Sequence, residues 1–122
     1  MAVVTTPCTM LFNGVNLTPN MASSNFTFPI GSNSRQYVNF YITGGNLSAI
    51  TGDIAIQFCF NPAQDAQWQV LNDLTGDPIS VGSDSTKFMF TCAIPMCMVI
   101  RAVNMDATET PVNPTDVHVG FC

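Results

Sequence analysis

Charged side chains are scarce in this sequence. Asp, Glu, Lys and Arg together make up 9% of its 122 residues, whereas they make up about 25% of an average soluble domain. The cations are Lys87, Arg35 and Arg101, and the net charge is −5. Because so few cations cannot assemble a basic patch, the composition argues against a nucleic-acid partner and against binding to anionic membranes.

Long apolar runs are also missing. No segment approaches the roughly 20 apolar residues that a membrane-spanning helix needs. The opening residues, M-A-V-V-T-T-P-C, lack both the basic start and the apolar stretch of a secretory leader. We therefore expect synthesis in the cytoplasm, with any exit from the cell occurring as part of a larger assembly.

Side chains suited to catalysis or metal binding are few. The single histidine, His118, lies between apolar residues in an alternating pattern, which predicts that it points outward from a strand. Asp73, Asp77 and Asp84 lie in successive turns without the ligand spacing or terminal Glu of an EF-hand. We interpret them as turn-forming residues. The sequence therefore predicts neither an enzyme nor a metal or cofactor site.

The cysteines number five, so at least one thiol is unpaired or pairs between chains. None belongs to a Cys-x-x-Cys pair, which argues against a zinc site. Cys92 shares a strand face with Phe88 and Phe90 and is predicted to be a buried free thiol. Cys8 and Cys122 lie near the ends of the chain, and an intermolecular disulfide through either one would favour an oligomer.

The stretch D-I-A-I-Q-F-C-F at residues 53–60 has the clearest structural pattern. Its apolar positions are Ile54, Ile56, Phe58 and Phe60. Their strict alternation predicts a strand with this face on the core. The other face, Ala55, Gln57 and Cys59, is small and uncharged, as a surface covered by a second subunit would be.

Similar patterns recur along the chain, separated by turn signals. They predict strands near residues 8–12, 24–30, 36–43, 53–60, 68–71, 78–81, 86–93, 97–105 and 117–122. The predicted fold class is all-β: an antiparallel two-sheet β-sandwich of jelly-roll or immunoglobulin-like type, with eight or nine short strands. Residues 21–122 would form this domain. Residues 1–20 would be either an N-terminal arm that reaches a neighbouring subunit or an edge strand.

The middle of the chain carries a further pattern. The run I-T-G-G-N-L-S-A-I-T-G-D-I-A-I-Q-F-C-F is followed by W-Q-V-L-N-D-L, K-F-M-F-T-C-A-I-P and M-V-I-R-A-V. Over about residues 38–103, this succession resembles small virion proteins of tailed bacteriophages. The resemblance implies a capsid decoration, or cement, protein, which sits on the assembled shell of the virion and stabilises contacts between major capsid subunits.

Decoration proteins are often trimers, so the resemblance also implies a homotrimer or other homo-oligomer, with the major capsid protein as its partner. The scarcity of charge fits a surface that other protein chains cover. We expect the N-terminal segment and the loops at one end of the sandwich to meet the shell. The possible interface residues are Cys8, Met10, Phe12, Tyr37, Tyr41, Trp68 and Cys122.

Two alternative functions remain open at this point. Another virion component, such as a tail, neck or fibre-base protein, would share the sandwich and the low charge. A carbohydrate-binding module would instead require Trp68, Tyr37 and Tyr41 to form an exposed aromatic platform.

Overall fold

Strands make up all the regular structure that can be described in the computed structural model. It describes residues 8–28, 37–45, 47, 50, 52–61, 63, 67–93, 99–105 and 116–122. Its strands are β1 (Thr9–Val15), β2 (Phe26–Thr27), β3 (Tyr37–Thr43), β4 (Ile54–Cys59), β5 (Gln69–Val70), β6 (Ser80–Val81), β7 (Met89–Ala93), β8 (Val99–Asn104) and β9 (Val117–Phe121). The prediction of an all-β chain with eight or nine short strands is confirmed, since these strands number nine. Residues 1–7, Ile30 and Cys97 lie outside the described residues.

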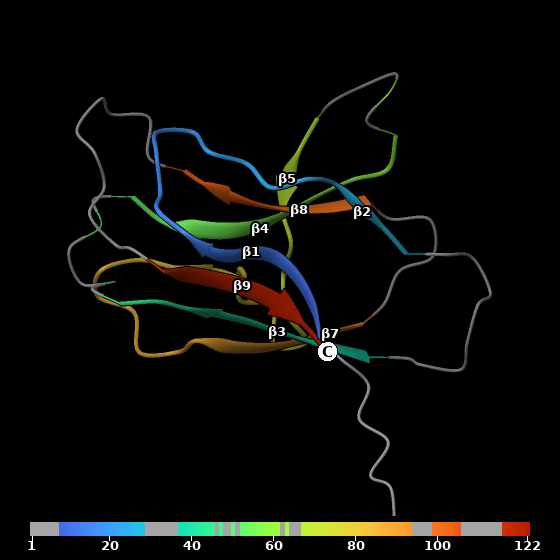
Figure 1. Ribbon diagram of the computed structural model, residues 1–122. Coiled ribbons are helices and arrows are strands. Elements are labelled where there is room, and N and C mark those ends of the chain that lie inside the picture. The colour runs from blue at the N-terminus through green and yellow to red at the C-terminus, as the bar shows by residue number, and fades with distance from the viewer. Residues whose placement is uncertain are drawn as a thin grey trace, which may run out of the picture.

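The strands form two antiparallel sheets (Figure 1). The four-stranded sheet has the order β1-β9-β3-β7. The five-stranded sheet has the order β2-β8-β4-β5, with β6 also paired to β4. Because β5 and β6 pair with successive parts of β4, they act as two halves of one edge strand. The two-sheet sandwich predicted from alternation is therefore the observed architecture.

The strand order identifies which kind of sandwich this is. β1 pairs with β9, β2 with β8, β3 with β7 and β4 with β5, all antiparallel. The chain is thus a long hairpin whose two arms pair along their length. Additional pairing of β9 with β3 and of β8 with β4 rolls that hairpin into two sheets. This is jelly-roll connectivity, and it differs from the immunoglobulin arrangement.

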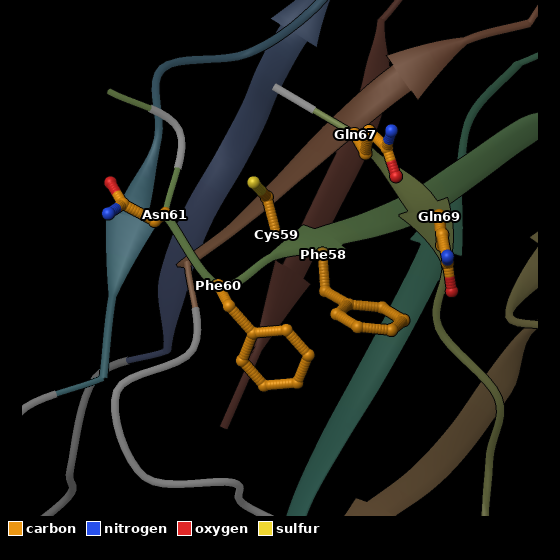
Figure 2. Close-up of a pocket in the computed structure, with 6 residues that line it drawn as sticks. All are labelled: Phe58, Cys59, Phe60, Asn61, Gln67 and Gln69. Atoms are coloured by element: carbon orange, nitrogen blue, oxygen red, sulfur yellow. The ribbon is translucent and has the colours of Figure 1, made fainter. Parts of the chain in front are cut away.

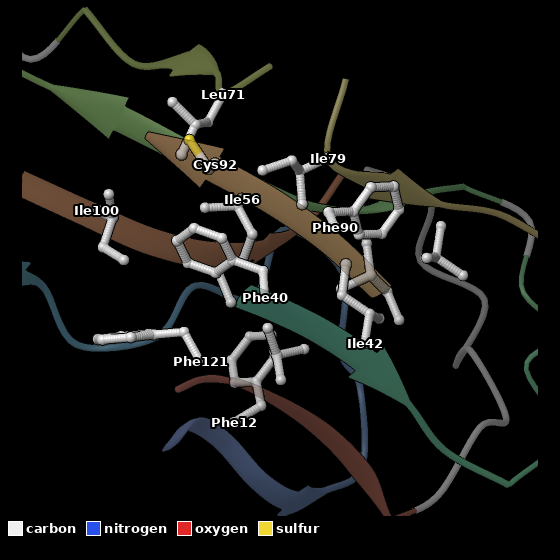
Figure 3. Close-up of a cluster of buried hydrophobic side chains, with 14 of the residues drawn as sticks. Phe12, Phe40, Ile42, Ile56, Leu71, Ile79, Phe90, Cys92, Ile100 and Phe121 are labelled. Atoms are coloured by element: carbon white, nitrogen blue, oxygen red, sulfur yellow. The ribbon is translucent and has the colours of Figure 1, made fainter. Parts of the chain in front are cut away.

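The core lies between the sheets and follows from period-two alternation. Val38, Phe40 and Ile42 on β3 are at most 1% exposed, while the residues between them face outward. Figure 3 shows Phe40 and Phe121 beside one another within this cluster. Their ring centroids are 5.5 Å apart at an interplanar angle of 53°. Such tilted aromatic contacts add to the free energy gained from apolar burial.

Two predictions about residues 53–60 are wrong. Phe60 is 69% exposed rather than part of the core, because β4 ends at Cys59 and pairing no longer fixes the direction of the next side chain. Ala55, Gln57 and Cys59 are already buried by their own chain, so no second subunit is needed to cover them. The expectation for Phe88 is wrong as well, since it precedes β7 and is 38% exposed.

The segment between β5 and β6 crosses from the five-stranded sheet to the edge of the four-stranded sheet. Residues 72–78 leave the edge of the five-stranded sheet, where Leu71 N donates to Ile56 O. Leu74 N then donates to Thr91 O on β7, at the edge of the other sheet, over 3.0 Å. We call this segment the 72–78 loop. It occupies an edge acceptor of β7 and links the two sheets on that side.

Candidate interaction surface

The outer face of the four-stranded sheet is the surface that gathers most of the predicted interface residues. We call it the open face. It consists of Met10, Asn13, Tyr37, Asn39, Tyr41, Thr43, Met89, Thr91, Ala93, His118, Gly120 and the Cys8–Cys122 disulfide. These positions alternate with the core residues of β1, β3, β7 and β9, so they point away from the other sheet. The outward orientation predicted for His118 is confirmed.

One row of the open face crosses all four strands. Register places Met10 opposite Gly120, Gly120 opposite Tyr41 and Tyr41 opposite Met89. Tyr41 Oη lies 2.8 Å from Met10 Sδ and donates a hydrogen bond across the intervening strand. A Cβ at position 120 would lie 2.8 Å from that hydroxyl. Glycine is therefore required so that the tyrosine can lie flat across β9.

The adjacent row contains the only disulfide among the described residues. Cys8 and Cys122 are 114 positions apart in sequence, and their Cα atoms are 4.4 Å apart. Cys122 exchanges two backbone hydrogen bonds of 3.0 Å with Asn39. Thr91 Oγ1 donates to Asn39 Oδ1 over 2.8 Å. The bridge between chains considered from the sequence is replaced by one within the chain, because the hairpin topology brings both ends together.

The open face combines apolar exposure with an absence of formal charge. Met89 is 66% exposed and Tyr37 is 52% exposed. Asp, Glu, Lys and Arg are absent from the described outward positions of these four strands. Since isolated exposed apolar residues are common on any protein, it is their grouping on one uncharged sheet face that indicates a contact surface.

The structure separates the seven predicted interface residues. Cys8, Met10, Tyr37, Tyr41 and Cys122 all lie on the open face. Phe12 is 2% exposed and belongs to the core, since the bulge between Met10 and Phe12 turns it inward. Trp68 lies beside the five-stranded sheet, against Arg101.

Several members of the open face were missed by sequence reasoning. Asn39, Met89 and Thr91 occupy outward positions that alternation alone could identify. Their grouping depends on β3 pairing with β7, which links residues about fifty positions apart, and no local pattern reports that pairing.

The outer face of the five-stranded sheet is covered by its own side chains. Arg101 Nε and Nη2 donate to Gln57 Oε1 over 3.0 and 2.9 Å. The guanidinium carbon lies 4.1 Å from the centroid of the Trp68 ring, a cation–π contact. Burial lowers the pKa of Arg101 from its ordinary value, and this side chain remains charged. Trp68 thus stacks on its own chain and lies on the opposite sheet from Tyr37 and Tyr41, so the three residues form no common sugar-binding platform.

A small pocket opens where β4 ends (Figure 2). It has a volume of about 220 Å³ and is lined by Phe58, Cys59, Phe60, Asn61, Gln67 and Gln69. The rings of Phe58 and Phe60 meet edge to face with centroids 5.6 Å apart. Figure 2 shows the Cys59 sulfur on the opposite side of the strand from these rings. The pocket presents no described pair of an acid and a base.

The 72–78 loop contributes the acidic partner of a salt bridge. Lys87 Nζ lies 2.7 Å from Asp73 Oδ2. Asp73 Oδ1 accepts hydrogen bonds from Thr75 N and Asp77 N, each of 2.9 Å, which makes an Asx turn. The Lys87 ammonium, aided by Thr75, holds the pKa of Asp73 well below its ordinary value. The turn-forming role predicted for Asp73 is confirmed.

Other kinds of site find no support in the described residues. They contain no group of three or more His, Cys, Asp or Glu side chains arranged to hold a metal ion. None of the described segments forms a helix long and apolar enough to cross a membrane. Comparison of the chain with known protein families, curated proteins and solved structures finds no match.

Proposed function

We propose that this chain is a structural virion protein of a tailed bacteriophage, a decoration protein that binds the assembled capsid. In this role it would stabilise contacts between major capsid subunits. The observation that carries the proposal is the open face: a four-stranded sheet surface with exposed Tyr37 and Met89 and no Asp, Glu, Lys or Arg at its described outward positions. Such a surface suits burial against another protein chain of the virion, whether a capsid subunit or a neighbouring copy, because none of these side chains has to lose the water around a charge on contact.

The strand order is a second support. Jelly rolls occur in viral capsid proteins, and also in lectins and cupins, so the fold by analogy favours a virion role without deciding it. The resemblance of residues 38–103 to phage virion proteins points in the same direction. A cupin-like metal site or a lectin-like aromatic platform would favour the other functions, and the described residues supply neither.

The geometry also suits a protein that works outside a cell. The Cys8–Cys122 disulfide ties both outer strands of the hairpin together, and such bonds persist in oxidising surroundings such as virion surfaces. Binding only the assembled state would stabilise the shell by mass action. Many copies on one shell would add avidity. We propose that the N-terminal segment contributes to contact with the shell.

Co-sedimentation with capsids of the phage that encodes the chain tests this function. The purified protein should pellet with empty expanded shells, saturate at a fixed copy number per shell, and remain in the supernatant with unassembled major capsid protein. Deletion of residues 1–7, which keeps Cys8 and its disulfide, should weaken pelleting without unfolding the domain. Failure to pellet with shells at any concentration, or equal binding to unassembled subunits, would contradict the proposal.

A further inference from the structure

The edges of both sheets are poorly suited to association between copies. β1 carries two register irregularities, between Met10 and Phe12 and between Asn13 and Val15. β2, β5 and β6 each contain only two residues. β7 is longer, but the 72–78 loop occupies it through the Leu74–Thr91 hydrogen bond. Short strands, bulges and covering loops are the usual protection against edge pairing. Pairing edge to edge is therefore disfavoured, which leaves the outer faces of the two sheets as the described surfaces to compare.

Charge decides which face two copies can share. Each copy carries a net charge of −5, so contact between carboxylate-bearing surfaces would be opposed by repulsion. The described carboxylates lie at strand ends and in turns: Asp53, Asp73, Asp77, Asp84 and Asp116. The five-stranded sheet presents Arg101 and Trp68, which are already engaged with each other. The open face is where two copies can meet without apposing like charges.

The polar groups of the open face are self-complementary. The amide of Asn39 and the hydroxyls of Thr91 and Tyr37 can each donate and accept hydrogen bonds. Two identical carboxylates or ammonium groups facing one another could not pair. Across a two-fold axis the same patch meets itself, so amides, hydroxyls, thioethers and rings fit a second copy of this chain. This argument distinguishes a second copy from a charged partner.

We infer that the open face is a self-association surface, through which two copies pack sheet against sheet about a two-fold axis. Strand spacings of about 4.8 Å and residue spacings of about 3.4 Å give four strands of five residues a plan area of roughly 300 Å². Two copies would therefore bury less than the standard interface of about 1,600 Å². The pair should be weak, with a dissociation constant that is micromolar or weaker, and it would be reinforced where many copies share one shell.

Sedimentation velocity with a matched pair of variants tests the inference. The oxidised wild-type chain should shift from monomer to dimer as its concentration rises from about 5 µM to about 1 mM. Met89→Glu places a carboxylate on the open face and should weaken dimerisation by at least about tenfold. Phe60→Glu adds the same charge at a side chain of similar exposure away from this face, and it should leave dimerisation within about twofold of wild type.

Three outcomes would overturn the inference. They are a wild-type chain that stays monomeric to about 1 mM, equal dimerisation by Met89→Glu and wild type, and greater disruption by Phe60→Glu than by Met89→Glu. Circular dichroism and thermal unfolding show whether each variant is folded. If Met89→Glu does not fold, Tyr37→Glu replaces it as the open-face variant. The inference does not depend on the phage role: a chain that pellets with shells but never dimerises would refute it and leave the proposed function standing.

Discussion

The two outer faces of this sandwich differ in how far side chains of the same chain cover them. On the five-stranded sheet, Trp68, Arg101 and Gln57 stack and hydrogen-bond over the strands. On the four-stranded sheet, Tyr37 and Met89 remain more than half exposed, and charge is absent from the described outward positions. One face is covered by side chains of its own chain. The other keeps exposed apolar side chains, as the proposed contact with another protein chain requires.

This difference shows why composition alone misleads about where a partner binds. Ala55, Gln57 and Cys59 have the small, uncharged character expected of a covered surface, and they are indeed buried, but by the same chain. Surface chemistry predicts that a face is covered. Only topology shows which element covers it.

The disulfide should give the largest effect, because it holds one margin of the open face. Its removal in the double variant Cys8→Ser and Cys122→Ser should lower the free energy of unfolding by about 4–5 kcal/mol, since the closed loop exceeds 100 residues. Urea denaturation of the oxidised chain, the reduced chain and the double variant measures this loss. When both are measured in reductant, the wild type and the double variant should have similar midpoints.

The reducing agent itself supplies the control for that experiment. Oxidised and reduced samples of both chains are compared, because only the wild type can form the Cys8–Cys122 bond. The difference between the two redox states should therefore be larger in the wild type than in the double variant. If the oxidised wild type and the double variant unfold at the same urea concentration, the bridge does not hold β1 to β9. The open face would then not be a fixed surface.

On the outer face of the five-stranded sheet, Arg101→Met should have the next largest effect. The variant keeps an apolar stem beside Trp68 but leaves Gln57 Oε1, in a side chain that is 8% exposed in total, without its two donors. An unpaired buried polar group costs about 1–3 kcal/mol. Denaturation by urea measures this loss, and the emission of Trp68, the single tryptophan, should shift to longer wavelength as its ring becomes more hydrated.

Tyr41→Phe on the open face is the matched comparison for Arg101→Met. It removes the hydroxyl contact with Met10 Sδ, a weak acceptor, at a site that water can reach. Its cost should stay below about 1 kcal/mol. Equal losses in Arg101→Met and Tyr41→Phe would show that the outer faces of the two sheets do not differ in how well their polar groups are shielded from water.

Acid should weaken the 72–78 loop, which lies along the β7 margin of the open face. Because the pKa of Asp73 is lowered in the folded chain by Lys87 and Thr75, its contribution to stability is complete above its ordinary value of 3.8 and is lost as the pH falls below it. Urea midpoints between about pH 6 and pH 2 should therefore fall more steeply for wild type than for Asp73→Asn.

The alkaline side gives an independent check on the same ion pair. Asp73 raises the pKa of Lys87 above its ordinary value of 10.5, so stability from the pair is present below that pH and is lost as the pH rises through the raised value. Asp73→Asn should therefore lose less stability than wild type on this alkaline side as well. Parallel pH profiles for wild type and variant would show that the pair contributes nothing.

Features of the fold could be predicted from the sequence where they depend on neighbouring residues alone. Alternation placed Val38, Phe40 and Ile42 inside and Tyr37 and Tyr41 outside, because a strand reverses its side chains at every residue. It failed at Phe60, just beyond the last paired residue of β4. Strand ends are set by pairing partners, which lie far away in the chain.

The interaction surface was predictable only in fragments, for the same reason. Five of the seven chosen residues lie on the open face, yet no sequence pattern joined Met10 to Tyr41 or Asn39 to Thr91. The cysteine pairing was equally hidden, since Cys8 and Cys122 become neighbours only when β1 pairs with β9. Rows across a sheet are long-range features, and they require the strand order.

The smallest expected effect comes from Thr91→Val, which sharpens the comparison on the open face itself. Valine keeps the shape and strand preference of threonine but removes the hydroxyl that donates to Asn39 Oδ1. Because water can replace this exposed donor, the free energy of unfolding of the monomer should change by less than about 0.5 kcal/mol. Urea denaturation at low protein concentration measures it. A loss above about 1 kcal/mol would show that the Asn39–Thr91 pair is shielded from water in the monomer, so that this part of the face is already covered before any second copy arrives.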